Sequence, residues 1–426
     1  MSRTLEGITG RRPGHRSRFP ERPPGGSLVG GGLLAVGLLL AGGLVTPLEA
    51  QHPPLPGPPS GFPMPETERS LVHPEPEEPR EVAAGDHLMY IGTYREGIYV
   101  LDEETESVVD VIELETGMAR TLYLNPEATR FYVRDISYEQ LEVVDLATRQ
   151  TLDVFTLSQG NEMVRIWNVA VAPGDEYAVL LVQSYRELPD RFVVGSRRLV
   201  QLDLNSGEVL REVPWPDDQE RLSATMHFSQ DGRWLYFFLD DIRIYDTTDF
   251  TEVDRWDYSD ALGGGLEEFS FGFPNSPFDE PGYFTGLFRT TDPIQERRLL
   301  GIARVQLDER DIEFFPLGPD WSGLRFSLAP GQDHAYALTN DVDDWQFWTI
   351  DMNARRITSQ QRFRGRARMS LQTSSSGDVL YIYNAGNTID LYEAATYRYL
   401  RTIVLDADTT TSLFVLPRPD SPTGDR

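Results

Sequence analysis

The sequence predicts an all-β fold, a seven-bladed β-propeller whose C-terminal strand closes the first blade. Three observations predict it. Short β-rich runs alternate with turn residues from His87 onward, without sustained helical periodicity. One four-strand unit recurs seven times, and the final strand supplies the one strand that the first unit lacks. Four-stranded units that repeat every 40–50 residues are typical of propeller blades.

The hairpin between the third and fourth strands marks each unit. Its third strand ends in an acid, followed by turn formers such as Asn205-Ser206-Gly207. The acids are Asp102, Asp145, Asp203, Asp246, Asp308, Asp351 and Glu393. Four of the six intervals between them are 42 or 43 residues long, and the two longer intervals hold insertions near 184–197 and 263–297. An acid in this position can accept hydrogen bonds from the turn amides, so we interpret these acids as structural.

The two ends of the repeat predict how the ring closes. The repeat begins at His87 with a second strand and ends with Leu413–Leu416, which has the pattern of a first strand. We expect Leu413–Leu416 to pair with the blade that contains Met89–Ile91, because this pairing removes an open sheet edge. The propeller is therefore predicted over residues 86–417, with a disordered tail over 418–426.

The N-terminal region has the organisation of an export signal. Residues 1–27 are rich in arginine, 28–45 are apolar without a charge, and Ala50 is a small residue suited to cleavage. The alternative is an uncleaved anchor, because 18 apolar residues reach the lower limit for spanning a bilayer. The proline-rich residues 51–85 are predicted to be a disordered linker. After cleavage of a signal peptide over 1–50, we expect an exported protein, periplasmic or extracellular, without a membrane span.

Composition excludes several kinds of chemistry. The chain contains neither lysine nor cysteine, and its formal net charge is −28. The absence of lysine excludes a P-loop lysine and a Schiff base, and the absence of cysteine excludes thiol nucleophiles, disulfides and covalently attached c-type haem. Nucleic acid is a poor partner for so acidic a protein. Solubility is the simplest explanation of the charge.

The motifs resemble those of the YVTN and 6-phosphogluconolactonase-like seven-bladed propellers. Met89-Tyr90-Ile91-Gly92-Thr93-Tyr94 is similar to the opening blade of the lactonase-like family, and turns such as Pro173-Gly174-Asp175 are similar to those of the YVTN type. The resemblance covers residues 87–417 and implies a WD-like repeat protein. Because its motifs are packing and turn motifs, it implies a fold and carries over no functional residue.

Catalytic and metal-binding motifs are absent from the sequence. There is no Gly-x-Ser-x-Gly, no His-Glu-x-x-His and no Gly-x-Gly-x-x-Gly that opens a helix. Glu267 and Glu268 are neighbours in a predicted strand, so they should point to opposite faces. Residues 340–344 are rich in aspartate, but they lack the glycine and terminal glutamate of an EF-hand and are interpreted as a solvated turn. We therefore assign no catalytic residue, no metal ligand and no cofactor.

The approaches to the first strands of the blades converge at the mouth of the central channel. Together with a first-strand histidine they supply the candidate ligand-binding residues Arg120, Arg165, Trp167, His227, Arg325, Arg366 and Arg368. Arginines and an aromatic side chain in a concave site suit a carboxylate or phosphate ligand. The alternatives are arginines that are solvated or paired with acids of the same domain, and a histidine that is hydrogen-bonded within its strand.

These features predict an exported, non-enzymatic propeller that acts as a binding or scaffold module for a protein partner or a small anionic ligand. One alternative is a lactonase-like enzyme that uses residues of the channel mouth. The other is the propeller subunit of a periplasmic quinoprotein (amine) dehydrogenase whose redox cofactor is held by another chain. Without cysteine, this chain itself cannot hold a disulfide-stapled quinone.

Overall fold

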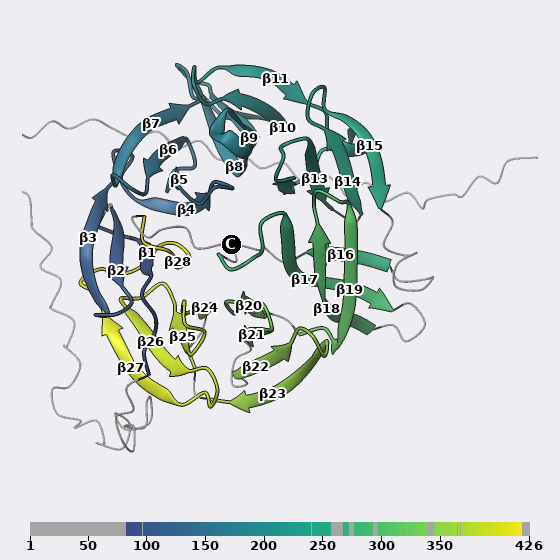
Figure 1. The fold of residues 1–426 in the computed structure, drawn as a ribbon. Coiled ribbons are helices and arrows are strands. Elements are labelled where there is room, and N and C mark those ends of the chain that lie inside the picture. Colours follow the sequence, from purple (N-terminus) through teal and green to yellow (C-terminus); the bar gives the residue numbers. More distant parts are fainter. Residues whose placement is uncertain are drawn as a thin grey trace, which may run out of the picture. The chain divides into compact units, whose positions relative to one another are not determined.

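The computed structural model describes residues 82–419 except 96, 240, 257–266, 272–276, 293–296, 322, 340–344, 364 and 367. The strands form seven separate four-stranded antiparallel sheets, which are arranged as the blades of a ring (Figure 1). The predicted seven-bladed propeller is thereby confirmed. The predicted signal segment and most of the predicted linker lie outside the described residues. No helix within the described part is long and apolar enough to cross a bilayer.

Neighbouring strands of every blade pair antiparallel, and the first blade combines both ends of the propeller sequence. In pairing order, blade 1 contains β28 (Phe414–Leu416), β1 (Leu88–Thr93), β2 (Gly97–Asp102) and β3 (Ser107–Glu113). Blade 2 contains β4 (Ala119–Leu124), β5 (Arg130–Asp135), β6 (Gln140–Asp145) and β7 (Gln150–Thr156). Blade 3 contains β8 (Glu162–Val171), β9 (Tyr177–Glu187), β10 (Phe192–Asp203) and β11 (Val209–Val213), with short 3-10 turns at Pro173–Asp175 and Pro216–Asp218.

The other four blades follow the same plan. Blade 4 contains β12 (Thr225–Phe228), β13 (Trp234–Phe238), β14 (Ile242–Asp246) and β15 (Thr251–Trp256). Blade 5 contains β16 (Glu267–Phe271), β17 (Tyr283–Asp292), β18 (Arg297–Gln306) and β19 (Asp311–Pro319). Blade 6 contains β20 (Arg325–Leu328), β21 (His334–Leu338), β22 (Gln346–Asp351) and β23 (Arg356–Arg362). Blade 7 contains β24 (Ser370–Thr373), β25 (Val379–Tyr383), β26 (Thr388–Glu393) and β27 (Tyr399–Val404).

The C-terminal strand closes the ring in the way the sequence predicts. Strand β28 pairs antiparallel with β1, and Tyr90 lies opposite Phe414. The ring of Phe414 packs edge-on against Phe131 of blade 2, with a centroid distance of 5.2 Å. Every residue of β1 and β28 is buried, because both strands pack between neighbouring blades. The first blade is thus completed by a segment more than 300 residues away in the sequence.

The acids that end the third strands act mainly as local turn acceptors. Asp203, for example, accepts hydrogen bonds from the amides of Asn205 and Ser206, both at 2.8 Å. Asp308 differs from this expectation. Its carboxylate accepts the amide of Gln230 at 2.8 Å, which joins blade 5 to the turn of blade 4. Asp308 therefore has a structural role, as predicted, but its contact with Gln230 links blades 4 and 5.

The two predicted insertions lie at the same end of the ring. The segment near 184–197 lengthens the β9–β10 hairpin, in which Glu187 pairs with Phe192. The described part of 263–297 contains β16 and the lengthened end of β17. Antiparallel pairing places the end of each second strand beside the start of its first strand. Both hairpins therefore extend from the face of the ring where the first strands begin, which we call the mouth face.

Candidate functional site

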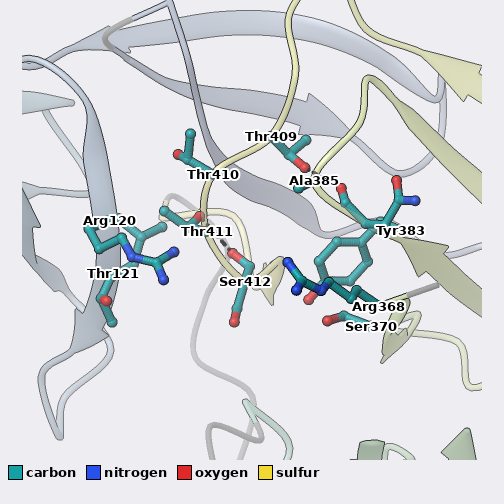
Figure 2. A pocket seen from close by; sticks show the side chains of 12 residues that line it. Arg120, Thr121, Arg368, Ser370, Tyr383, Ala385, Thr409, Thr410, Thr411 and Ser412 are labelled. Carbon is teal, nitrogen blue, oxygen red and sulfur yellow. Dashed lines mark hydrogen bonds between the residues drawn. The ribbon is translucent and has the colours of Figure 1, made fainter. Parts of the chain in front are cut away.

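A cavity of about 250 Å³ opens on the mouth face between blades 7, 1 and 2 (Figure 2). Blade 2 contributes the start of β4, blade 7 contributes the start of β24 and the end of β25, and the segment before β28 forms the floor. The lining residues are Arg120, Thr121, Leu122, Arg368, Ser370, Tyr383, Asn384, Ala385, Thr409, Thr410, Thr411 and Ser412. Figure 2 shows the guanidinium groups of Arg120 and Arg368 directed toward each other from opposite sides of Ser412.

Backbone hydrogen bonds fix the segment before β28. The amide of Thr410 donates to the carbonyl of Gly92 at 2.8 Å, and the amide of Gly92 donates to Oγ1 of Thr411 at 2.8 Å. Gly92 is required for this close approach, because an added Cβ would lie 2.6 Å from Cγ2 of Thr411. On the other side, the amide of Leu413 donates to the hydroxyl of Tyr383 at 2.9 Å. The cavity floor is therefore held at both ends.

Two arginines line the cavity, and a third acts electrostatically on a lining residue. Arg120 is exposed, and its Nε donates to the hydroxyl of Tyr138 at 3.1 Å. Arg368 is exposed and has a φ of 60°. Arg325, the first residue of β20, acts electrostatically on Tyr383: burial raises the pKa of this tyrosine, and Arg325 partly opposes the rise. Within the described part of the chain, none of the three arginines forms an ion pair.

Hydroxyl groups dominate the rest of the cavity wall. Thr121, Ser370, Tyr383 and the run Thr409–Ser412 all contribute hydroxyls, and no aspartate or glutamate is among the lining residues. The γ-oxygen of Thr410 is buried without a hydrogen-bond partner in the described structure. Guanidinium groups together with hydroxyl donors can hold a carboxylate or a phosphate.

Arg366 is positioned differently from Arg368, although both were expected at the channel mouth. Its Nη2 lies 2.8 Å from a carboxylate oxygen of Asp390 on β26, and both Nη atoms donate to Oγ1 of Thr388 at 3.1 Å. The residue does not line the cavity. The guanidinium of Arg366 is therefore engaged by an acid of its own blade, the alternative that the sequence left open.

Arg165 and Trp167 lie on β8 of blade 3 and also do not line the cavity. The guanidinium of Arg165 lies 4.9 Å from the ring centroid of Tyr185. The ring of Trp167 lies 5.2 Å from the ring of Tyr138 and 4.8 Å from the guanidinium of Arg197. The structure therefore places Arg120 and Arg368 in the cavity lining. Arg325 does not line the cavity but acts electrostatically on the lining residue Tyr383, and Arg165 and Trp167 lie in a neighbouring cluster.

His227, on β12, packs in an aromatic cluster with rings from β13 and β17. Its ring centroid lies 4.5 Å from that of Phe284 and 5.7 Å from that of Phe238. Burial lowers the pKa of His227 to about 4, so the imidazole is neutral at pH 7. The side chain does not line the cavity.

The pKa of His227 predicts a pH-dependent stability. Between pH 6.5 and 4 the unfolded chain binds a proton at this site that the folded chain rejects, so stability falls as the pH falls. We expect His227→Asn to remove this dependence. The difference in unfolding free energy between wild type and variant should change by about 2 kcal/mol between pH 7 and pH 4.5, as measured by urea denaturation.

The comparison with the variant isolates His227 from an opposing group. Burial raises the pKa of Asp279 to about 6, so Asp279 favours the folded state at low pH. Because Asp279 is present in both proteins, its contribution cancels in the difference. A difference that stays constant between pH 7 and pH 4.5 would show that His227 titrates alike in the folded and unfolded chains.

Other sequence candidates gain no support as reactive sites. Glu267 and Glu268 lie in β16, but their side chains are outside the described structure, as are residues 340–344. Among the described residues, no group of three or more histidine, aspartate or glutamate side chains could hold a metal ion. Sequence reasoning missed Ser370, Tyr383 and Thr409–Ser412. The threonine run could have been found, since it leads into the closing strand in the same way that the arginines lead into theirs.

Comparisons with known proteins place the fold in context. No protein-family model matches the chain, and no curated protein matches it. Among solved structures, hydrazine synthase of Kuenenia stuttgartiensis is similar at 11% identity and a TM-score of 0.44, covering 79% of this chain and 99% of that chain. Dihydro-heme d1 dehydrogenase NirN in complex with DHE is similar at 13% identity and a TM-score of 0.48, with 81% and 79% coverage.

A protein of unknown function from Desulfotomaculum acetoxidans DSM 771 is similar at 10% identity and a TM-score of 0.48, covering 78% of this chain and 99% of that chain. Likenesses this distant carry no information about ligands or activity. The chain is a seven-bladed β-propeller because its own strands form seven blades.

Proposed function

We propose that this propeller is an exported, non-enzymatic binding module whose mouth-face cavity holds the carboxylate or phosphate group of a small anionic ligand. One observation carries the proposal: Arg120 and Arg368 line a hydroxyl-rich cavity, and Arg325 acts electrostatically on the lining residue Tyr383. None of the three arginines has an ion-pair partner among the described residues. Like charges repel unless a counter-charge is present. A bound anion provides that counter-charge, and a planar guanidinium can bind it in bidentate fashion.

The size and polarity of the cavity support a small ligand. Its volume of about 250 Å³ lies below the roughly 300–1,000 Å³ of sites for drug-sized molecules. Leu122 and Ala385 are the only aliphatic side chains in its lining. This composition suits an acidic group with a short carbon skeleton better than an apolar molecule.

A non-catalytic role fits the same lining. Hydroxyl nucleophiles such as Ser370 require a neighbouring general base, and the cavity lining includes no histidine, aspartate or glutamate. The finer resemblance to YVTN and lactonase-like propellers remains a prediction. No contact among the described residues specifically favours a lactonase-like enzyme or a dehydrogenase subunit over a binding module.

Titration calorimetry with acetate and with inorganic phosphate at low ionic strength tests this proposal. We expect at least one of these anions to bind the wild-type protein and to bind Arg368→Ala at least tenfold more weakly, because the variant loses a bidentate donor. Arg186→Ala is the matched control: Arg186 is also an exposed arginine of the mouth face, but it is paired with Glu162 at 3.1 Å. Equal affinities for wild type and Arg368→Ala, or no binding of either anion, would contradict the proposal.

A further inference from the structure

A buried arginine lies directly beside the cavity wall. Arg134 of β5 is only 7% exposed, and it forms no ion pair with a described carboxylate. Its Nη2 donates to Oγ1 of Thr121, a cavity residue, at 2.8 Å, and its Nη1 donates to the backbone carbonyls of Ile166 and Trp167. Its Nε has no hydrogen-bond partner among the described residues. Carbonyl and hydroxyl oxygens stabilise this buried cation, but no described carboxylate neutralises its charge, and a nearby anion would therefore be stabilised by it.

Aromatic rings connect Arg134 to further arginines. Its guanidinium lies 4.3 Å from the ring centroid of Tyr138, and the hydroxyl of the same tyrosine accepts Nε of Arg120. The ring of Trp167 contacts Tyr138, and the guanidinium of Arg197 lies over the same ring. These contacts connect Arg120, in the blade 2 wall of the cavity, with Arg197 on the lengthened β9–β10 hairpin of blade 3.

A second set of contacts, on the β9–β10 hairpin, connects Arg197 with Arg165. Nε of Arg197 donates to Oε1 of Gln183 at 3.3 Å, and the hydroxyl of Tyr185 donates to the same oxygen at 2.8 Å. The ring of Tyr185 in turn lies beside Arg165. We call the whole set the arginine row: Arg120, Arg134, Arg165 and Arg197, with the rings of Tyr138, Trp167 and Tyr185.

Arg134, Arg165 and Arg197 each lie within 5 Å of an aromatic ring centroid, a contact that uses none of their N–H donors. A guanidinium that lies over a ring keeps its N–H groups in its own plane, where they can still bind an anion. None of the four arginines forms an ion pair with a described carboxylate, although the protein is strongly acidic. Within the described structure, Nε of Arg165 and Nε1 of Trp167 are also buried without hydrogen-bond partners. Three buried donors without partners lie close together in this row, and a bound anion is one explanation for them.

We infer that the anion-binding site continues from the cavity along the arginine row, so that the natural ligand carries at least two anionic groups. One group occupies the cavity between Arg120 and Arg368, and the second lies against Arg165 and Arg197. The inference rests on the proposed function and specifies its ligand class: a molecule with two or more carboxylates or phosphates. Linking two groups makes the second contact intramolecular, so a polyanion should bind more tightly than a single anionic group.

Calorimetry on pairs of anions tests this inference. At constant ionic strength, citrate is compared with acetate, and tripolyphosphate with inorganic phosphate, which separates the carboxylate and phosphate alternatives. We expect the polyanion to bind wild type at least tenfold more tightly than its simpler counterpart in at least one pair. In the double variant Arg165→Ala/Arg197→Ala, the ratio of the two affinities should fall to less than about three.

The matched control removes the same charge from the same blade. Arg186 and Arg198 are more than 40% exposed, and each is paired with a glutamate, Glu162 and Glu212 respectively. The double variant Arg186→Ala/Arg198→Ala should keep the wild-type ratio. Circular dichroism checks the fold of both double variants. If Arg165→Ala/Arg197→Ala does not fold, the single variant Arg197→Gln replaces it. We expect Arg197→Gln to lower the ratio of polyanion affinity to simple-anion affinity at least threefold.

The outcomes separate this inference from the proposed function. A ratio that is equal in the Arg165→Ala/Arg197→Ala variant and in its control overturns the arginine row as a ligand site, even if Arg368→Ala still weakens acetate or phosphate. If the polyanion and its simpler counterpart bind wild type with nearly equal affinity in both pairs, the arginine row is overturned as a ligand site as well. Insensitivity of every anion to Arg368→Ala instead overturns the proposed function.

Discussion

Deletion of residues 409–426 is expected to lower the unfolding free energy by at least about 5 kcal/mol. The deletion removes β28, in which Phe414, Val415 and Leu416 are 2%, 1% and 3% exposed. Complete burial of each such side chain contributes about 1.5–3 kcal/mol. The deletion also exposes the edge of β1, whose backbone groups pair with β28 in the intact ring.

Urea denaturation followed by tryptophan fluorescence measures this loss. If the truncated chain does not fold, Phe414→Ala measures the same contact, with an expected cost of about 3–5 kcal/mol from the cavity left against Phe131. Val404→Ala is the control, because Val404 is 69% exposed on β27 and should change the stability by less than about 0.5 kcal/mol. A truncated protein as stable as the full-length chain would show that β28 does not close the ring.

Substitution of Arg366 by alanine is expected to cost about 3 kcal/mol of unfolding free energy. Asp390 is 4% exposed, and its two carboxylate oxygens are bound by Arg366 at 2.8 Å and by Thr402 at 2.6 Å. Removal of the arginine takes an ion-pair partner away from this buried carboxylate, and loss of one partner of a buried charge is the costly case among changes to ion pairs. The variant should retain its affinity for acetate or phosphate, since Arg366 does not line the cavity.

Arg368→Ala is the matched comparison, two residues away in the same segment. Arg368 is exposed and has no ion-pair partner among the described residues, so its replacement should change stability by less than about 0.5 kcal/mol. Thermal and urea denaturation of both variants, in buffer without multivalent anions, give the comparison. Equal stabilities for the two variants would mean that the ion pair of Arg366 with Asp390 contributes nothing to the fold.

The blades could be predicted because the repeat is local. An acid followed by a turn, a strand of alternating pattern and a spacing of 42 or 43 residues are all readable along the chain. The closing strand could be predicted because a missing strand at one end matched an extra strand at the other. The contact of Asp308 with Gln230 could not, because it depends on how neighbouring blades pack rather than on the local pattern.

The site could be predicted only in part, for the same reason. Alignment of the approaches to the first strands selected Arg120 and Arg368, which line one cavity, but it selected Arg366 equally. The partner of Arg366 lies on the third strand of its blade, and the strand register that brings the two together is not visible in sequence. Arg134 was missed because it lies on the second strand of its blade, and the sequence of this strand has the pattern of a buried core strand.

The most direct measurement is a crystal structure of the protein grown in selenate, a dianion that stands in for phosphate and gives an anomalous signal. We predict the strongest anomalous peak in the mouth-face cavity, within hydrogen-bond distance of both Arg120 and Arg368. A second, weaker peak against Arg165 and Arg197 would support the arginine row. An empty cavity, with selenate bound only to exposed arginines elsewhere, would contradict the claim that this face of the propeller binds anions.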